Sequence, residues 1–231
     1  GCVTEDGESF EYEVATHGMP ISQAGASAYK TIKNLGGDPE NPFALYEDVE
    51  AYWQHVLDQK RADAQKRREE EAQWRAANPG LAEKWDEFME GNPKNIKFNE
   101  IEVKADNHTR GASGQVLSYF SQHVENMIVA SADLANSDKT IGFLDHSTPL
   151  VKDDFSGGFL HAGVSELSMA AISCGIALHK GVYAVCGTFF AFSDFMKPSL
   201  RLAALMELPV KFIWTHDSFR VGEDGPTHQP V

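Results

Sequence analysis

The sequence has little of three features that would assign it to other classes of protein. Its 231 residues contain only three cysteines (Cys2, Cys174 and Cys186), whose spacing fits neither a disulfide framework nor a set of metal ligands. No stretch reaches the roughly 18 apolar residues of a membrane span, and the N-terminus has no apolar signal core. Basic residues are also scarce: 20 Lys and Arg against 34 Asp and Glu give a net charge of -14, which argues against a nucleic acid or an anionic membrane as partner. We therefore expect a cytoplasmic protein with reduced thiols.

The composition is that of a globular protein, with 42% hydrophobic and 23% charged residues. At roughly 150 residues per domain, 231 residues correspond to one complete domain and part of another. The chain opens on Gly1 and ends at Val231, directly after a motif described below. We expect a piece that is cut at both ends.

Two amphipathic segments follow the turn-rich first 45 residues. Apolar residues at helical spacing predict a long helix over residues 46–77, whose remaining positions are charged, with exposed pairs such as Lys66 and Glu70. Asn78-Pro79-Gly80 ends this helix, and a second amphipathic set predicts a shorter one that stops before residues 91–93. We interpret the helical pair as a connector between domains.

The second half of the chain alternates apolar strands with helical patterns, which predicts an α/β fold with a parallel sheet. We expect residues 138–157 to form a loop. The expected strands cover residues 126–131, 158–165 and 209–214, and residues 182–195 are expected to be an apolar strand that ends in an aromatic cluster. The expected helices cover residues 115–123, 166–179 and 198–207.

A polar, turn-rich run follows the last strand. Residues 215–231 read THDSFRVGEDGPTHQPV and bring His216, Asp224 and His228 to the carboxyl end of a strand, where α/β sheets bind ligands. A solvated loop is the alternative. Gly225 and Pro226 restrict the backbone between the polar residues, which favours a ligand site.

Three other polar residues lie at element ends. Arg110 before a helix and Ser137 after a strand are candidate phosphate contacts, because helix N-termini and strand-end loops offer free N–H groups; surface positions are the alternative. Glu166 lies at a strand-to-helix junction, where the helix N-terminus favours a carboxylate. This position fits both a structural role in the first turn and a functional role.

The run at 215–231 resembles the transketolase signature, a Thr-His-Asp-Ser segment followed by Gly-Glu-Asp-Gly-Pro-Thr-His-Gln-Pro. Residues 16–21, which include His17, and residues 34–43 resemble the end of that family's cofactor-diphosphate domain, with Met19 where Ala is usual. Residues 131–137 (SADLANS) resemble its sugar-phosphate segment. The resemblance covers nearly the whole chain.

Two further segments resemble the family with departures. Residues 163–169 (GVSELSM) keep the Glu and Met of a Gly-Val-Arg-Glu-His-Ala-Met segment, but Ser165 replaces the Arg, which leaves charge balance and interface pairing there open. Phe189, Phe192 and Phe195 resemble the rings that cradle the family's aminopyrimidine, with Phe195 in place of Tyr. At this spacing the rings share one helical face, which core packing would also explain.

The resemblance implies the thiamine-diphosphate-binding fold in three parts. Residues 1–45 would be the tail of the diphosphate-binding domain, residues 46–106 a helical connector, and residues 107–231 a truncated pyrimidine-binding domain. It implies a transketolase of the pentose phosphate pathway, which moves a two-carbon ketol unit from a ketose phosphate to an aldose phosphate.

The resemblance also implies cofactors and partners. Thiamine diphosphate would lie between the subunits of a homodimer, with Mg²⁺ or Ca²⁺ on its diphosphate. The chain has no Gly-Asp-Gly followed by Asn at the spacing used to hold that metal, so we expect the metal ligands upstream of this piece, no metal ligands within it, and no activity from the piece alone.

Each candidate residue receives a role from the resemblance. Glu166, His228 and His17 would be catalytic, with Glu166 as the acid that activates the cofactor. The cofactor contacts would be Glu166, Phe189, Phe192, Phe195, Asp133 and His17. The substrate contacts would be Arg110, Ser137, His216, Asp224, His228 and His17.

Three alternatives differ in how they can be separated from this interpretation. A dihydroxyacetone synthase shares these motifs, and only an assay with formaldehyde against ribose 5-phosphate as acceptor would distinguish it. A deoxyxylulose-phosphate synthase is disfavoured because that family does not keep the Gly-Glu-Asp-Gly-Pro-Thr-His-Gln-Pro run in this form. A non-catalytic interaction module would fit if the full gene lacked the diphosphate and metal motif.

Overall fold

The computed structural model describes residues 1–94, 96–217 and 224–230. The chain divides into two compact units, Gly1–Trp74 and Arg75–Val231, here called the N-terminal and C-terminal units. The N-terminal unit contains no strand among its named elements, whereas all four strands of the described residues lie in the C-terminal unit. Each unit is described by itself.

The N-terminal unit is built from short helical pieces and one long helix. Its short elements are a 3-10 turn η1 (Val14–Thr16) and the helices α1 (Ile21–Ala24) and α2 (Ala28–Asn34). Ser27 caps α2 by accepting a hydrogen bond from the Lys30 N–H (3.2 Å), and the buried Thr31 hydroxyl accepts one from the Val3 N–H (3.1 Å). These two contacts tie the start of the chain to α2.

The predicted long helix is confirmed as α3 (Glu47–Ala77), which continues past Trp74 into the second unit. The expected pair of Lys66 and Glu70 is present at 3.8 Å on its exposed surface. Although α3 has 31 residues, it is strongly charged, and within the described part of the chain no helix is both long and apolar enough to cross a membrane.

The predicted second helix is also confirmed. Helix α4 (Pro79–Glu90) starts with Pro79 in its first turn and ends at Gly91, whose φ of 72° allows the left-handed C-terminal cap. A 3-10 turn η2 (Phe98–Glu100) then leads toward the sheet.

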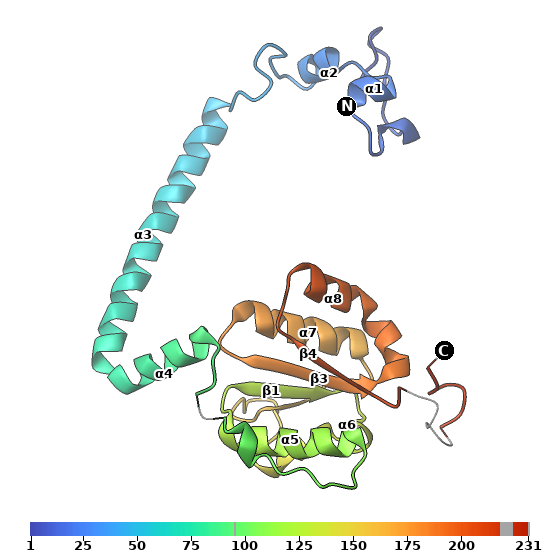
Figure 1. Ribbon diagram of the computed structural model, residues 1–231. Coiled ribbons are helices and arrows are strands. Elements are labelled where there is room, and N and C mark those ends of the chain that lie inside the picture. Colours follow the sequence, from blue (N-terminus) through green and yellow to red (C-terminus); the bar gives the residue numbers. More distant parts are fainter. Residues whose placement is uncertain (95, 218–223, 231) are drawn as a thin grey trace. The chain divides into compact units, whose positions relative to one another are not determined.

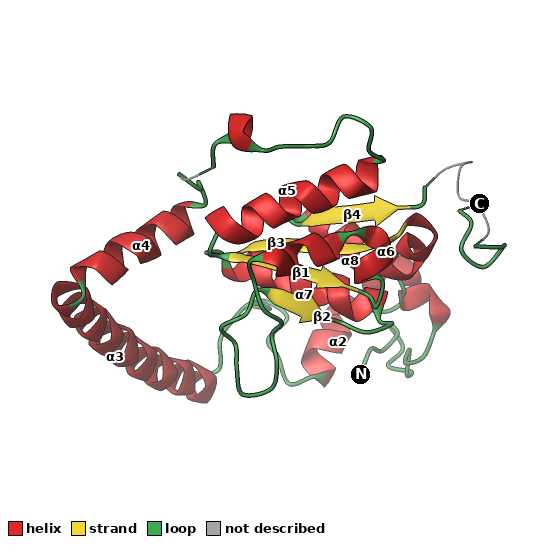
Figure 2. Cartoon of the chain, turned by 90° about the horizontal axis from the view of Figure 1, so that it is seen from below, coloured by secondary structure: helices red, strands yellow, loops and turns green. Residues whose placement is uncertain are grey.

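The C-terminal unit contains a four-stranded, fully parallel sheet, as the alternating pattern predicted. Its strands are β1 (Met127–Ser131), β2 (Phe159–His161), β3 (Tyr183–Phe189) and β4 (Lys211–Thr215), in the order β2-β1-β3-β4. Helices α5 (Thr109–His123) and α6 (Ala135–Asp138) cover one face, and α7 (Glu166–His179) and α8 (Ser193–Leu205) cover the other (Figures 1 and 2).

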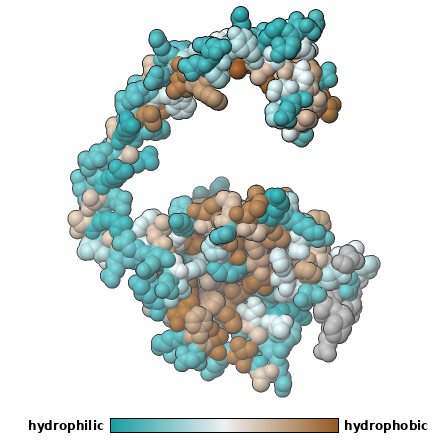
Figure 3. Space-filling model, turned by 45° about the horizontal axis from the view of Figure 1, so that its top comes forward, coloured by the Kyte–Doolittle hydropathy of each residue, from teal (hydrophilic) through white to brown (hydrophobic). Residues whose placement is uncertain are grey.

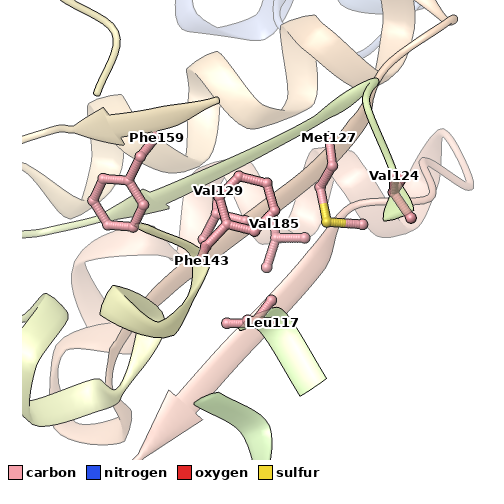
Figure 4. Close-up of a cluster of buried hydrophobic side chains, with 7 residues drawn as sticks. All are labelled: Leu117, Val124, Met127, Val129, Phe143, Phe159 and Val185. Atoms are coloured by element: carbon pink, nitrogen blue, oxygen red, sulfur yellow. The ribbon is translucent and has the colours of Figure 1, made fainter. Parts of the chain in front are cut away.

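Both faces of the two central strands are buried, and alternate residues of each strand point to opposite faces. Val129, Val185 and Phe159 pack with Leu117 of α5 and with Phe143 in the cluster shown in Figure 4. Their strand neighbours Ala130, Cys186 and Leu160 belong to a second cluster on the opposite face. Phe212 of β4 also packs there, with Met169 of α7 and Met196 of α8. Burial on this face raises the pKa of the Cys186 thiol to about 12, so this cysteine stays protonated and unreactive.

Three boundaries predicted from the sequence for the segments before β3 are wrong. Residues 138–157 are not all loop, because a 3-10 segment η3 (Thr140–Asp145) folds so that Phe143 enters the core. The strand expected over 158–165 is limited to Phe159–His161. Helix α5 starts at Thr109, so Arg110 lies inside its first turn rather than before it.

The helix expected to start at Pro198 is longer than predicted. The chain leaves β3 through a 3-10 turn η4 (Phe190–Phe192) and enters α8 at Ser193, with Asp194 in the first turn where the helix dipole favours a carboxylate. Pro198 therefore lies inside the helix. Because proline has no backbone N–H, it cannot donate a hydrogen bond to the preceding turn. As a result Phe189, Phe192 and Phe195 lie on a strand, a 3-10 turn and a helix, not on one helical face.

Close backbone contact holds α5 against the α6–η3 segment. A methyl group at Gly142 would lie 2.3 Å from the carbonyl oxygen of Gly114, and one at Gly114 would lie 2.9 Å from that of Lys139. Backbone atoms cannot move aside as side chains do, so only glycine fits at both positions. This packing fixes the start of α5 next to the turn that follows β1.

We predict that Gly142→Ala lowers the free energy of unfolding of the 231-residue chain by about 1–3 kcal/mol, because the added methyl group overpacks this contact. Urea unfolding measures the change. Gly175→Ala is the control: Gly175 is exposed on α7 with nothing within 4 Å of the added carbon, so helix propensity should leave stability equal or raise it. Equal stability of Gly142→Ala and the wild type would contradict the packing argument.

Candidate functional site

The sheet has a topological switch point between β1 and β3. The chain passes from β1 to β2 on one side and from β3 to β4 on the other, so the connections diverge at the carboxyl ends of the two central strands. Open parallel sheets bind ligands in the crevice outside such a point. Most of the candidate residues of the C-terminal unit lie on the segments that follow β1, β3 and β4.

Arg110, Ser137 and His216 meet at this edge although they are far apart in the sequence. Nη1 of Arg110, in the first turn of α5, donates to the carbonyl oxygen of Ser137 in α6 (3.1 Å) and contacts Nε2 of His216 after β4 (2.6 Å). All three residues are partly buried. The three predicted phosphate contacts therefore form one cluster, with Ser137 contributing its main-chain carbonyl to it.

Hydrogen bonding determines the protonation of His216. A guanidinium has only donors, so Nε2 of His216 must accept from Arg110, and the ring proton lies on Nδ1, which donates to the Thr215 hydroxyl (2.9 Å). Burial and then the positive charge of Arg110 lower the pKa of His216 below its ordinary 6.5, although Asp224 and Asp138 act in the opposite direction. His216 therefore binds a second ring proton more readily in the unfolded chain than in the folded one. As a result, the free energy of unfolding decreases as the pH falls through 6.5.

Three phenylalanine rings form a stack that starts at the end of β3. The rings of Phe189 and Phe192 are stacked with centroids 5.9 Å apart, and those of Phe192 and Phe195 at 6.2 Å. His216 lies over Phe189 with centroids 3.7 Å apart, which joins the phosphate-binding candidates to the rings. Phe189 is 4% exposed and Phe195 is 62% exposed, so the stack runs from the core to the surface. It offers flat apolar surface to a planar ligand.

His228 lies beside the same rings. Its imidazole meets Phe192 edge-on at 5.2 Å and Phe189 at 6.0 Å, and its Nδ1 is 2.8 Å from the Thr227 hydroxyl. Asp224 is exposed and close enough to His216 for its charge to favour protonation of that ring. The structure thus brings two of the predicted histidines to one aromatic group; residues 218–223 between them lie outside the described residues.

Glu166 is the first residue of α7 and is only 7% exposed. Ser165 precedes it but does not cap the helix, since its hydroxyl donates to the Ala162 carbonyl (2.6 Å). The Ser165 side chain therefore makes no hydrogen bond to the first-turn N–H groups of α7. The positive end of the helix dipole lies next to the buried carboxyl group of Glu166. This confirms the predicted helix start at Glu166, whereas the strand before it ends at His161.

Two other candidates have separate surroundings. Asp133 is exposed just after β1 with a left-handed backbone (φ 62°). His17 belongs to the N-terminal unit, where it is exposed directly after η1. Among the described residues no group of three or more His, Cys, Asp or Glu side chains is arranged to hold a metal ion.

The sequence analysis did not identify Asp138, which lies next to the cluster. It is 1% exposed and accepts hydrogen bonds from Ser131, Thr140 and the Thr140 N–H. The available signal was the Asp-x-Thr pattern after a strand, which is typical of a turn in which a carboxylate bonds the N–H two residues on.

Comparisons with known proteins identify the family of the chain. The family model of the transketolase pyrimidine binding domain matches residues 106–231. Transketolase of Halalkalibacterium halodurans is 39% identical over 220 residues, which are 94% of this chain and 32% of that protein. Transketolase of Staphylococcus aureus (strain MW2) is 36% identical over 225 residues, which are 93% of this chain and 32% of that protein. The chain thus spans 32% of the length of these curated relatives.

Solved structures give the same result for the fold. A transketolase from Leishmania mexicana superposes with a TM-score of 0.76 at 29% identity, covering 90% of this chain and 32% of that chain. A transketolase from Pichia stipitis in complex with sedoheptulose-7-phosphate superposes at 0.77 with 30% identity, covering 90% of this chain and 33% of that one. The sheet therefore has the thiamine-diphosphate-binding fold, and the chain belongs to the transketolase family.

Proposed function

We propose that this chain is part of an enzyme that transfers a two-carbon ketol unit from a ketose phosphate to an aldose phosphate with thiamine diphosphate, the transketolase reaction of the pentose phosphate pathway. The observation that carries the proposal is the contact of Arg110 with His216 and Ser137 beside the phenylalanine stack. A cationic group next to flat apolar surface suits a sugar phosphate bound beside a planar cofactor. Pichia stipitis transketolases in complex with sedoheptulose-7-phosphate and xylulose-5-phosphate support this substrate class.

The side chains present fit the aminopyrimidine half of thiamine diphosphate. That half is a flat aromatic ring with hydrogen-bonding nitrogens, and the chain offers a stack of rings and a buried carboxyl group at a helix N-terminus. Phe189, Phe192 and Phe195 would hold the ring by its faces, and Glu166 would hold a proton against a ring nitrogen. Asp133, on the segment after β1, would be a further contact of the cofactor.

When bound, thiamine diphosphate supplies the acidic carbon on which a two-carbon unit is carried. Glu166 would act as an acid that donates a hydrogen bond to a pyrimidine ring nitrogen and so holds a proton at that atom. His228 and His17 would hydrogen-bond the hydroxyls of the sugar and exchange protons with its oxygens, and Asp224 would accept from a hydroxyl. His17 is part of the proposal on the resemblance alone.

Arg110, His216 and the Ser137 segment would hold the phosphate group. The neutral His216 that accepts from Arg110 in the free chain would gain a proton when a phosphate dianion approaches, because the dianion offsets the charge of Arg110. Both side chains could then donate to the phosphate oxygens.

We further propose a homodimer with the active site between subunits. Exposed apolar side chains on α7 and α8 support this proposal, among them Leu167, Ile172 and Leu202, at 47%, 47% and 53% exposure. Figure 3 shows apolar side chains gathered over the C-terminal unit, whose top is formed by these helices. Mg²⁺ or Ca²⁺ with the diphosphate would be held by ligands outside this chain.

Glu166→Gln in the full-length holoenzyme is expected to lower turnover by a factor on the order of 10² or more while leaving the melting temperature nearly unchanged, because it removes an acid but keeps the shape of the side chain. A steady-state ketol-transfer assay measures the effect. Glu83→Gln, at an exposed position of α4, is the matched control and should be fully active. Full activity of the Glu166 variant would refute the role of this residue.

Arg110→Ala is expected to raise the KM for xylulose 5-phosphate on the order of 10- to 100-fold, since it removes charge-assisted hydrogen bonds to the phosphate. The KM for unphosphorylated xylulose should change little. Arg68→Ala, at an exposed position of α3, controls for the loss of a positive charge. If both sugars lost affinity equally, Arg110 would not be a phosphate contact.

A further inference from the structure

Asp138 is a buried carboxyl group without an assigned role. It ends α6 and is 1% exposed. Oδ2 accepts from the Ser131 hydroxyl (2.8 Å), and Oδ1 accepts from both the Thr140 N–H (2.8 Å) and the Thr140 hydroxyl (2.7 Å). Burial raises its pKa, whereas the hydrogen bonds from Thr140 and Ser131 oppose that shift. Removing this carboxyl group alone would leave its buried hydrogen-bond donors without their acceptor, which lowers the stability of the fold.

The hydrogen bonds of Asp138 shape the turn after β1. The bond to the Thr140 N–H spans Lys139, which has a left-handed backbone (φ 65°) that a non-glycine residue rarely adopts without local support. Ser131, which ends β1, donates to Asp138 and also accepts from the Leu134 N–H (3.2 Å). One carboxyl group thus links the end of β1, the end of α6 and the start of η3.

Asp138 also lies directly against β3. A methyl group at Gly187 would be 2.5 Å from Cγ2 of Thr140 and 3.1 Å from Oδ2 of Asp138. Gly187 is the β3 partner of Ser131 in the sheet. The carboxyl group therefore lies over the face of the sheet at the paired residues Ser131 and Gly187, near the carboxyl ends of the two central strands.

The neighbouring residue connects this turn to the phosphate-binding candidates. Ser137 precedes Asp138 in α6, and its carbonyl oxygen accepts from Arg110, the residue that contacts His216. The charge of Asp138 also acts on His216. Any rotation of α6 would move the Ser137 carbonyl and release Arg110 from its position.

We propose that Asp138 is a positioning residue for phosphate recognition: its hydrogen bonds fix the turn of residues 134–140 so that Ser137 holds Arg110 toward the sugar phosphate. The inference rests on the proposed function, because the ligand is the phosphate group of that substrate. Asp138 itself does not contact the substrate. It acts through α6.

The test compares two substitutions of Asp138 in the full-length holoenzyme with xylulose 5-phosphate and xylulose as donors. Asp138→Ala removes all three hydrogen bonds and should raise the KM for xylulose 5-phosphate on the order of tenfold, with little change in kcat or in the KM for xylulose. Asp138→Asn keeps an acceptor for Thr140, and its amide can donate to Ser131, whose hydroxyl can rotate to accept. This variant should bring the KM back close to the wild-type value, because it keeps the hydrogen bonds and loses only the charge that acts on His216.

Asp154→Ala is the matched control. Asp154 makes the same kind of bonds, to the N–H and hydroxyl of Ser156 (3.0 and 2.7 Å), but it is exposed and bonds only within its own turn. It should leave both KM values unchanged. Equal losses for the two donors in Asp138→Ala, an unchanged KM for the phosphorylated donor, or failure of Asp138→Asn to restore it would each overturn the proposal.

A second measurement covers the case in which Asp138→Ala does not fold. Inorganic phosphate is titrated into the 231-residue chain, and the imidazole resonance of His216, identified by its loss in His216→Asn, is followed by NMR. Ser131→Ala removes one of the three bonds of Asp138 together with the bond from the Leu134 N–H in the same turn. It should weaken the phosphate-dependent shift, and a shift equal to that of the wild type would overturn the proposal. If the wild-type holoenzyme did not prefer the phosphorylated donor, the proposed function would fail; if it did and Asp138→Ala kept that preference, only the role of Asp138 would fail.

Discussion

The parallel pairing of β1 with β3 is the constraint on which the candidate site depends. It places Ser131 beside Gly187 and makes the chain diverge at the carboxyl ends of the two strands. The segment after β1 must then turn within the narrow space next to β3, where Gly187 leaves room for the carboxyl group of Asp138. The phenylalanine stack starts at the end of β3 and continues on the segment that follows it. The polar part of the site thus follows β1 and the aromatic part follows β3. Elsewhere both faces of this strand pair are buried.

The contact of Arg110 with His216 joins these two sides. Arg110 reaches His216 from α5, and the same imidazole lies over Phe189. A neutral histidine beside a guanidinium is stable in the free chain because its burial and the neighbouring charge both disfavour the imidazolium. The arrangement keeps a cation, an adaptable imidazole and an apolar surface together before any ligand arrives. This preorganisation suits recognition of a phosphate group next to a planar ring.

The sequence predicted those parts that depend on local pattern. Apolar runs located the four strands, and the junction before α7 placed Glu166 at a helix N-terminus, as observed. Tertiary packing decided what the pattern missed. Pro198 was interpreted as a helix start although α8 begins at Ser193. Asp138 was included in an expected loop, although it is buried, which is rare for a carboxylate. The contact between Arg110 and His216 spans 106 positions, so no local pattern could predict it. Positions at the ends of elements made Arg110 and Ser137 candidate phosphate contacts, and the family resemblance favoured that role over ordinary surface positions.

The central claim is that Arg110, His216 and the Ser137 turn form the phosphate-binding part of the site. A crystal structure of the full-length holoenzyme with bound xylulose 5-phosphate tests it most directly. The account predicts phosphate oxygens at about 3 Å from both the guanidinium of Arg110 and Nε2 of His216, with the direct contact between these two side chains broken or lengthened. A phosphate group bound elsewhere, with Arg110 still 2.6 Å from His216 as in the free chain, would contradict it.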